Sequence, residues 1–349
     1  MQLALSLLLL PLACNYPSLR RLWRMTEQTS HNIISKALDF AAGESVYFAF
    51  QGGEPLIAGL PYFENFVKVT RELNIRHSVV YFSLQTNGTL VTDEWAKFFK
   101  NNNFLIGLSL DGNQNANKFR VDNGLNYTFP QVFACAQLFQ RYDVDFNILT
   151  VTTGYTAEHI TEIYNFFKQN NFRHLQFIPC LRPFGDTQEN ELFMTPSQYS
   201  TFLITLFNLY VKDYVRGDYT SVRMLDNMVN LYLGKAPEQC GVCGHCSHQF
   251  VFEGNGNAYP CDFYCSDEWL LGNVNNVDFE ALARCDKATA FIKESFDIPT
   301  KCLQCNLLGI CRAGGCKRSR QDRDYCQSYT TFFNACLPLF TVFNNEKLN

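Results

Sequence analysis

The chain has 349 residues, of which 47 % are hydrophobic and 18 % are charged. This composition supplies enough apolar surface for a buried core and argues against an intrinsically disordered chain. The length predicts about two domains. With 33 acidic and 29 basic side chains the net charge is −4, so the chain lacks the basic excess that nucleic-acid binding requires. We therefore expect a folded protein with no nucleic-acid partner.

The first fourteen residues, MQLALSLLLLPLAC, are strongly apolar. A signal peptide or lipobox is one interpretation, but no Lys or Arg precedes the apolar run and Pro11 stands where a lipobox has a branched aliphatic residue. The run is also too short to span a bilayer, and no other segment has 18 uninterrupted apolar residues. A buried strand over 3–10 explains the stretch better, and we expect a soluble protein without a membrane partner.

Up to about residue 215, short β-rich runs alternate with amphipathic stretches whose apolar residues recur at helical spacing. Strands are predicted at 3–10, 46–50, 79–85, 104–110, 144–151 and 174–178. Helices are predicted at 25–42, 61–73, 92–102, 129–141, 156–170, 196–215 and 222–233, with Thr26, Thr92 and Thr156 at or near three of the helix starts. Six strands with intervening helices predict a parallel sheet covered by helices, either curled into a partial barrel or doubly wound.

Polar, glycine-rich turns follow four of the predicted strands. They are Gln51-Gly52-Gly53-Glu54, Gln85-Thr86-Asn87-Gly88, Ser109 with Asp111 and Gly112, and Cys180-Leu181. In either architecture ligands bind at the carboxyl ends of the strands. Glycines let the backbone approach a ligand closely, and the Glu54 carboxylate can hold a ligand ammonium group. Each of these turns alone is an ordinary turn former, but four at one edge predict a binding site.

From Gln239 onward the sequence consists of short loops, turns and cysteines. Of the 15 cysteines in the chain, 11 lie between Cys240 and Cys326, and the clustering and odd total favour thiolate ligand sets over disulfides. Eight of them, spaced Cys240-x5-Cys246-x14-Cys261 and Cys302-x2-Cys305-x5-Cys311-x4-Cys316-x9-Cys326, predict two four-thiolate sites. Spacing alone leaves zinc and iron–sulfur open. A ligand-binding rim followed by two such sites suits electron transfer and favours iron–sulfur.

Six short motifs carry a more specific resemblance: FAFQGGEP at 48–55, SLQTNGTL at 83–90, GLSLDG at 107–112, LQFIPCL at 175–181, YPCDFY at 259–264 and YCQSY at 325–329. From about Met25 almost to its C-terminus, the chain resembles the anaerobic sulfatase-maturating enzymes. These are radical S-adenosylmethionine (SAM) proteins with a C-terminal SPASM domain. The resemblance implies an α/β fold, with a partial (β/α)6 TIM-like radical SAM barrel over 1–215 and a cysteine-rich SPASM domain with two auxiliary [4Fe-4S] clusters over 216–349.

The implied activity is the oxidation of a Cys or Ser of a sulfatase polypeptide to Cα-formylglycine under anaerobic conditions. It begins when a reduced cluster splits SAM into methionine and a 5′-deoxyadenosyl radical, which takes a Cβ hydrogen from the target side chain. The family also implies an electron donor such as flavodoxin or ferredoxin and, because such clusters are oxygen-labile, a reducing cytoplasm.

The same resemblance assigns the site residues. The SAM contacts are Gly52, Gly53, Glu54, Ser109, Arg120 and Leu181. Gln51 and Gln85 line the substrate rim, and Asp262 matches the family's proton acceptor. The first auxiliary cluster matches Cys240, Cys246, Cys261 and Cys316; the second matches Cys302, Cys305, Cys311 and Cys326. Cys243 and Cys265 match no ligand.

One departure from the family concerns the radical SAM cluster, which needs a Cys-x3-Cys-x2-Cys loop after the first strand. Cys14-Asn15 resembles the first two positions, but Cys14 stands alone and the next cysteine is Cys135. The resemblance resumes at Met25, which indicates a deletion or a reading-frame disruption. Three interpretations stay open: a damaged gene record of an active enzyme, an inactivated copy that keeps its auxiliary clusters, and a working protein with another use for its SAM pocket. Beyond these, the chain could be a non-catalytic peptide binder stapled by clusters or zinc, or another SPASM peptide maturase.

Overall fold

The computed structural model describes residues 5–10, 24–185, 190–322 and 325–344. They divide into two compact units. The first unit contains residues up to 109 together with 131–146 and 247–294, and the second contains 110–130, 147–246 and the residues from 295 onward. The predicted domain boundary between residues 215 and 216 stays a prediction. No helix of the described residues is both long and apolar enough to cross a bilayer.

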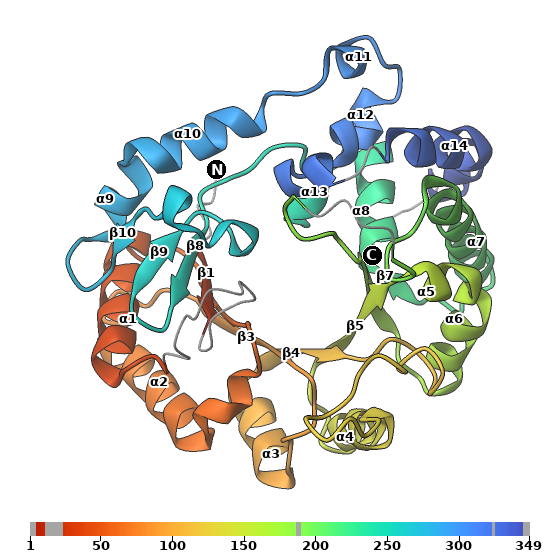
Figure 1. Cartoon of the computed structure of the whole chain (residues 1–349). Coiled ribbons are helices and arrows are strands. Elements are labelled where there is room, and N and C mark those ends of the chain that lie inside the picture. Colours follow the sequence, from red (N-terminus) through yellow and green to blue (C-terminus); the bar gives the residue numbers. More distant parts are fainter. Residues whose placement is uncertain (1–4, 11–23, 186–189, 323–324, 345–349) are drawn as a thin grey trace. The chain divides into compact units, whose positions relative to one another are not determined.

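Four parallel strands organise the first unit: β1 (Leu5–Leu10), β2 (Val46–Phe50), β3 (Val80–Thr86) and β4 (Phe104–Ser109). β2 pairs with β1 and with β3, and β3 pairs with β4. Helices α1 (Glu27–Ala41), α2 (Leu60–Leu73) and α3 (Asp93–Asn101) lie outside these strands (Figure 1). These elements confirm the predicted strands and helices to within about two residues at each end.

Local chemistry explains where these helices begin. The Thr26 and Thr92 hydroxyls accept hydrogen bonds from the N–H groups of Thr29 and Trp95, so both residues cap a helix N-terminus as predicted. Helix α4 (Phe129–Arg141), predicted at the same residues, ends on a basic side chain, Arg141, which suits the negative end of the helix dipole.

Strand alternation sorts the side chains of β2 onto two faces. Phe48 and Phe50 are fully buried and their rings meet Phe66 of α2 at centroid distances of 5.2 and 5.0 Å. Because side chains alternate along a strand, Tyr47 and the residue after the strand, Gln51, lie toward the opposite face. The apolar face thus packs on the helices while the polar end of the strand is left for a site.

The last segment of the first unit adds strands to the same sheet. β8 (Phe250–Glu253) pairs in parallel with β1, β9 (Asn257–Tyr259) pairs antiparallel with β8, and β10 (Gly272–Asn273) pairs with β9. Two helices follow, α9 (Phe279–Arg284) and α10 (Asp286–Ser295). The expectation of only loops and turns after Gln239 was therefore wrong. These strands have only two to four residues each and lie among cysteines and glycines, so the sequence did not show them as strands.

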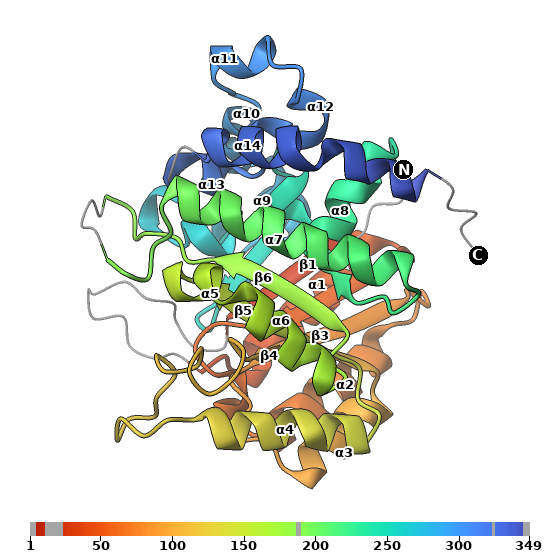
Figure 2. The ribbon, with the colours of Figure 1, turned by 90° about the vertical axis from the view of Figure 1, so that its right-hand side faces the viewer.

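The second unit contains the parallel strands β5 (Phe146–Thr152), β6 (His174–Pro179) and β7 (Ser221–Val222). Its long helix α7 (Pro196–Val215) packs beside α14 (Cys326–Cys336), as Figure 2 shows, with Phe207 and Phe332 in edge-to-face contact at 5.5 Å. Helix α8 (Arg223–Tyr232) matches its prediction, whereas α14 was not predicted.

The stretch 156–170, predicted as one helix, is two: α5 (Gly154–Glu158) and α6 (Ile160–Gln169). The cap of α5 is Thr153, whose hydroxyl accepts from the Thr156 N–H at 3.3 Å. Thr156 is therefore the third residue of α5, near the helix start as predicted. Three short helices, α11 (Thr300–Leu303), α12 (Leu308–Cys311) and α13 (Lys317–Asp322), carry much of the cysteine-rich segment.

Candidate active site and cluster-binding segments

The candidate proton acceptor, Asp262, contacts two other predicted site residues in the first unit. It begins a short 3-10 helix, Asp262–Tyr264, that follows β9, and Gln51 directly follows β2. Gln51 Nε2 donates to Asp262 Oδ2 at 2.9 Å, and the Cys261 thiol donates to Asp262 Oδ1 at 3.3 Å. One carboxylate therefore joins the substrate rim to a predicted cluster ligand.

Glu54 ties two turns of the rim together. Its Oε1 accepts from the Leu56 N–H at 3.0 Å and from the Thr86 hydroxyl at 2.9 Å, and its Oε2 accepts from the Asn87 N–H at 2.8 Å. Burial raises the pKa of the Glu54 carboxyl, and these hydrogen bonds offset part of the shift. The structure thus gives Glu54 a role in holding the turns, while its predicted contact with a ligand ammonium stays a prediction.

Glycine is required in these turns. Gly52 and Gly53 have φ values of 90° and 57°, and Gly88 has φ +77° with an added Cβ only 2.7 Å from Leu108 Cδ1. Residues with side chains are disfavoured at such φ values, so these turns need glycine at the three positions. The rim residue Gln85 is exposed near the end of β3, and Ser109 is the last residue of β4.

The other two predicted SAM contacts, Arg120 and Leu181, belong to the second unit. The Arg120 guanidinium forms a two-pronged ion pair with Asp111, Nε to Oδ2 at 2.6 Å and Nη2 to Oδ1 at 2.8 Å. Leu181 lies two residues after β6. Gly52, Gly53, Glu54 and Ser109 belong to the first unit, so the meeting of all six residues on one SAM molecule stays a prediction.

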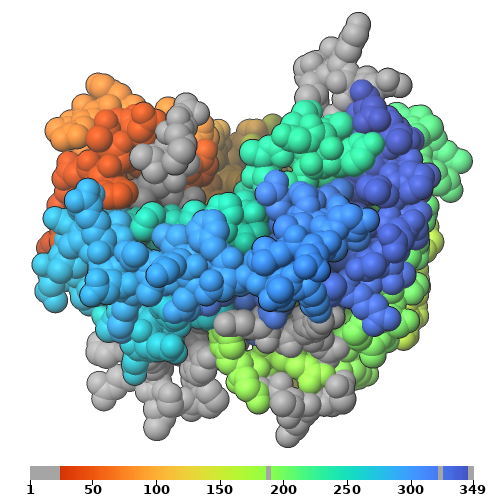
Figure 3. Space-filling view, turned by 90° about the horizontal axis from the view of Figure 1, so that it is seen from above, coloured from red at the N-terminus to blue at the C-terminus, as the bar shows by residue number. Residues whose placement is uncertain are grey.

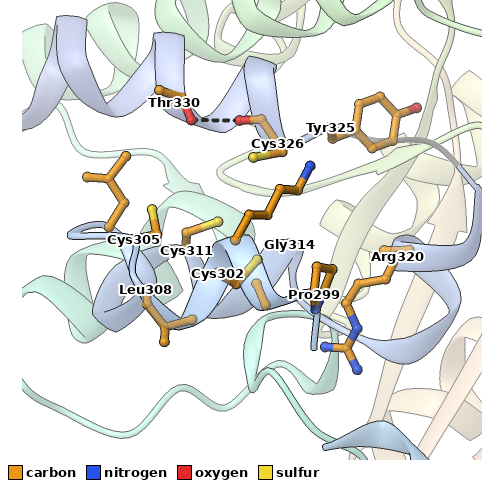
Figure 4. Close-up of a pocket in the computed structure, with 14 residues that line it drawn as sticks. Pro299, Cys302, Cys305, Leu308, Cys311, Gly314, Arg320, Tyr325, Cys326 and Thr330 are labelled. Atoms are coloured by element: carbon orange, nitrogen blue, oxygen red, sulfur yellow. Dashed lines mark hydrogen bonds between the residues drawn. The ribbon is translucent and has the colours of Figure 1, made fainter. Parts of the chain in front are cut away.

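Four of the predicted ligands line one cavity of about 370 Å³ in the second unit. Figure 4 shows Cys302, Cys305, Cys311 and Cys326 around it, on α11, α12, the turn between them and the first residue of α14. Burial, reinforced by the neighbouring cysteines, raises the pKa of the Cys311 thiol to about 11. The segment that carries these cysteines reaches the surface of its unit (Figure 3).

The donor set of this cavity fits an iron–sulfur cluster. A [4Fe-4S] cube takes four thiolates around its corners, whereas zinc draws its four ligands onto one atom. Four thiol side chains around one cavity fit the donor set of such a cluster.

The second unit also carries three predicted ligands of the other cluster, Cys240, Cys246 and Cys316. Their segments pack closely: the Cys316 N–H donates to the Gly241 carbonyl at 3.1 Å, and the Cys246 N–H donates to the Ser295 hydroxyl at 2.8 Å. The fourth ligand, Cys261, belongs to the first unit. The complete four-cysteine set therefore stays a prediction, although the donors present are those a cluster requires.

The sequence analysis missed two residues, Arg320 and Gly315, that hold the Cys240–Cys246 segment against the residues just before Cys316. Arg320 donates to the carbonyls of Gly244 at 3.1 Å and Gly315 at 2.8 Å. Gly315 has φ +90°, and an added Cβ there would overlap the Gly241 carbonyl oxygen. The Gly-Gly pair before Cys316 was the available signal, because paired glycines indicate close backbone approach.

The given sequence contains no Cys-x3-Cys-x2-Cys motif, so the ligands of a radical SAM cluster stay unassigned. Cys14 lies outside the described residues, and the sequence has no further cysteine before Cys135. A Cys-x3-Cys-x2-Cys loop supplies three thiolates, and residues 14–24 contain one cysteine.

Comparison with known proteins places these features in a family. Residues 12–167 match the model of the radical SAM superfamily, and residues 235–306 match an iron–sulfur cluster-binding domain called SPASM. A cysteine-type anaerobic sulfatase-maturating enzyme of Clostridium perfringens is 40 % identical over 93 % of this chain and 90 % of its own length. The chain belongs to the anaerobic sulfatase-maturating enzymes.

The structural comparison agrees with this assignment. The solved structure of native anSMEcpe with bound AdoMet and Cp18Cys peptide matches with a TM-score of 0.92 and 39 % identity, over 98 % of this chain and 99 % of that one. A serine-type maturating enzyme of Bacteroides thetaiotaomicron is 26 % identical over 93 % of this chain and 84 % of its own length. The predicted family, radical SAM and SPASM fold, and iron–sulfur character are confirmed, and the doubly wound alternative is excluded.

Proposed function

We propose that this anaerobic sulfatase-maturating enzyme acts on a cysteine of a sulfatase polypeptide and that Asp262 accepts the proton released as the side chain is oxidised. The observation that carries the proposal is the position of the Asp262 carboxylate between Gln51 and Cys261, with contacts of 2.9 and 3.3 Å. The peptide-bound relative supports the substrate class, and the greater identity to cysteine-type than to serine-type enzymes supports cysteine as the target.

The proton and the electron must leave the substrate together. Once a Cβ hydrogen atom has been taken from the cysteine, the carbon radical becomes a thioaldehyde by losing one more electron and the thiol proton. Water then replaces the sulfur, which leaves as hydrogen sulfide, and the aldehyde of formylglycine results. A cluster bound at Cys261 would supply an electron acceptor. Asp262 stands beside that ligand and within reach of the rim, so its carboxylate can take the proton as a general base.

Gln51 would keep this base in place. Its amide donates to one carboxylate oxygen of Asp262, which fixes the carboxylate plane. The cavity of Cys302, Cys305, Cys311 and Cys326 would hold the second cluster and extend the electron path. A flavodoxin or ferredoxin then serves as electron donor, and the reducing cytoplasm as the compartment.

A second candidate function rests on the lone Cys14. A chain without the three-cysteine loop would bind SAM and the sulfatase peptide but would not cleave SAM. Such a protein would act as a peptide-binding copy of the enzyme, with its two auxiliary clusters as structural and redox elements.

The experiment that separates the two candidates combines a metal count with a peptide assay. The chain is purified anaerobically, its clusters are reconstituted, and iron, sulfide and zinc are measured per chain. Peptides containing Cys-x-Pro-x-Arg and matched Ser-x-Pro-x-Arg are then assayed by mass spectrometry. About twelve irons with formylglycine from the cysteine peptide support catalysis, because three [4Fe-4S] clusters are then present. About eight irons, with no 5′-deoxyadenosine formed, support the binding function.

A variant in which a Cys-x3-Cys-x2-Cys loop replaces residues 14–24 completes the test. If the variant forms formylglycine where the original chain does not, the Asp262 site is competent and only the radical cluster is missing. If both fail while about twelve irons are bound, the assignment of Asp262 and Gln51 is wrong.

A further inference from the structure

The loop after β4 contains an ion pair whose geometry leaves half of a guanidinium group available. Asp111 is the second residue beyond β4, and its side chain is 11 % exposed, against 24 % for its partner Arg120. The contact is side-on: Asp111 receives the Nε–H and one Nη2–H of Arg120. A guanidinium has five N–H donors in a planar fork, so the end-on edge formed by Nη1 and the second Nη2–H is not used by Asp111.

Within the described part of the chain, no protein acceptor contacts that end-on edge. Among the residues that the structure describes, the side-chain hydrogen bonds of Arg120 all go to Asp111. A partly buried donor pair of this kind is suited to a second carboxylate, because arginine binds carboxylates through two parallel N–H···O bonds. SAM carries one carboxylate, next to its positively charged ammonium and sulfonium groups. An arginine in the SAM site therefore has one group to bind.

The Asp111 carboxylate is itself held rigidly. Its Oδ1 accepts from the Val151 N–H at 2.8 Å, and its backbone N–H donates to Asn117 Oδ1 at 3.0 Å. Asn117 is buried and donates in turn to the Gly112 carbonyl at 2.7 Å. The Thr128 N–H and hydroxyl both donate to the Arg120 carbonyl at 3.1 Å. The backbone on both sides of the ion pair is thus fixed before any ligand arrives.

We propose that Asp111 is a positioning residue that fixes the Arg120 guanidinium side-on, so that its end-on edge is presented to the carboxylate of SAM. The inference rests on the proposed SAM site and adds to it the residue that orients the arginine. Without Asp111 the long Arg120 side chain would stay free to change rotamers until SAM binds. The entropy cost of ordering it would then weaken the binding of SAM. Asp111 does not touch SAM in this scheme and acts only through Arg120.

Binding calorimetry with two nucleosides tests the proposal without turnover. S-adenosylhomocysteine retains the amino-acid carboxylate, whereas 5′-methylthioadenosine lacks it. In the full chain with reconstituted clusters, Asp111→Asn should weaken S-adenosylhomocysteine binding about tenfold or more, the size expected for loss of a charge-assisted contact. It should leave 5′-methylthioadenosine binding within about twofold. Asp111→Glu should restore part of the affinity, and Asp122→Asn, an exposed carboxylate of the same loop, should change neither ligand.

The binding results distinguish a failure of the Asp111 proposal from a failure of the SAM site itself. If Asp111→Asn binds S-adenosylhomocysteine as the unmodified chain does, or loses both nucleosides equally, Asp111 does not position the arginine. If the unmodified chain binds neither nucleoside, the SAM site itself fails and this inference fails with it. Should Asp111→Asn not fold, Arg120→Lys carries the test, because lysine keeps the charge but lacks the fork. It should lose S-adenosylhomocysteine selectively, and equal binding of both nucleosides would overturn the proposal.

Discussion

Gln51 Nε2 and Asp262 Oδ2 lie 2.9 Å apart although 211 positions separate the two residues in the sequence. The contact brings the end of β2 to the turn after β9, within one unit. A donor on one carboxylate oxygen leaves the other close to Cys261. The carboxylate is therefore oriented with one oxygen toward Gln51 and the other toward Cys261, a predicted cluster ligand.

Asp262→Asn should abolish most peptide oxidation while leaving the iron content unchanged, because an amide cannot accept the substrate proton. Loss of a general base costs about a hundredfold or more in rate. The measurement is formylglycine formation in the chain with the restored cysteine loop, alongside iron per chain. Asp267→Asn, an exposed carboxylate in the next 3-10 helix, serves as the control. Unchanged oxidation by Asp262→Asn would exclude it as the proton acceptor.

The shared cavity of Cys302, Cys305, Cys311 and Cys326 predicts a loss of iron confined to one cluster. Replacing Cys305 with serine should lower iron by about four per chain, because a [4Fe-4S] cluster that loses a thiolate is destabilised as a whole. Cys285→Ser, outside both predicted ligand sets, should leave the count unchanged. Equal losses in both variants would show that cysteine content, not the cavity, governs loading.

Much of the first unit could be predicted from sequence because its strands and helices follow simple periodicities. Phe48 and Phe50 alternate with residues that face the other way, and Thr26 and Thr92 cap the helices where the hydroxyl pattern predicts. After Gln239 that information is absent. β9 has three residues and β10 has two, too few for alternation to be visible, and their position depends on pairing with β8.

The candidate site was predictable for a different reason, and only in part. The family resemblance assigned roles to Asp262, Gln51 and the cavity cysteines, but it could not show which side chains touch. The role of Arg320 depends on carbonyls of Gly244 and Gly315 that converge only in the folded chain. Asp111 stood out in the sequence as one polar residue of a turn. Its ion pair with Arg120 gives it a distinct role.

Gly315 tests the close packing between the segment of Cys240 and Cys246 and the segment of Cys316. Gly315→Ala should destabilise the chain by about 1 to 3 kcal/mol, because φ is positive and the new Cβ would overlap the Gly241 carbonyl oxygen. Iron should fall by the amount of one cluster, about four per chain. Gly309→Ala is the matched control, since nothing lies within 4 Å of an added Cβ there and its φ is ordinary. Melting temperature and iron content measure both effects, and equal behaviour of the two variants would contradict the close approach.

The raised pKa of the Glu54 carboxyl predicts that its contribution to the stability of the fold depends on pH. Burial raises the folded-state pKa above the ordinary value of 4.5 despite hydrogen bonds from Asn87, Leu56 and Thr86. The folded chain then binds the proton more tightly than the unfolded chain. The contribution of Glu54 to stability is therefore fully present below about pH 4.5 and is lost as the pH rises through the raised folded pKa.

Glu54→Gln removes this titration while keeping the side-chain shape. The melting-temperature difference, original chain minus variant, should therefore fall as the pH rises from 4.5 toward neutrality and then level off. Glu64→Gln on the exposed side of α2 should show no such trend. A difference for Glu54→Gln that stays constant over the whole range would mean that the hydrogen bonds from the two rim turns outweigh burial. Glu54 would then be a fully ionised tie between the turns at every pH tested.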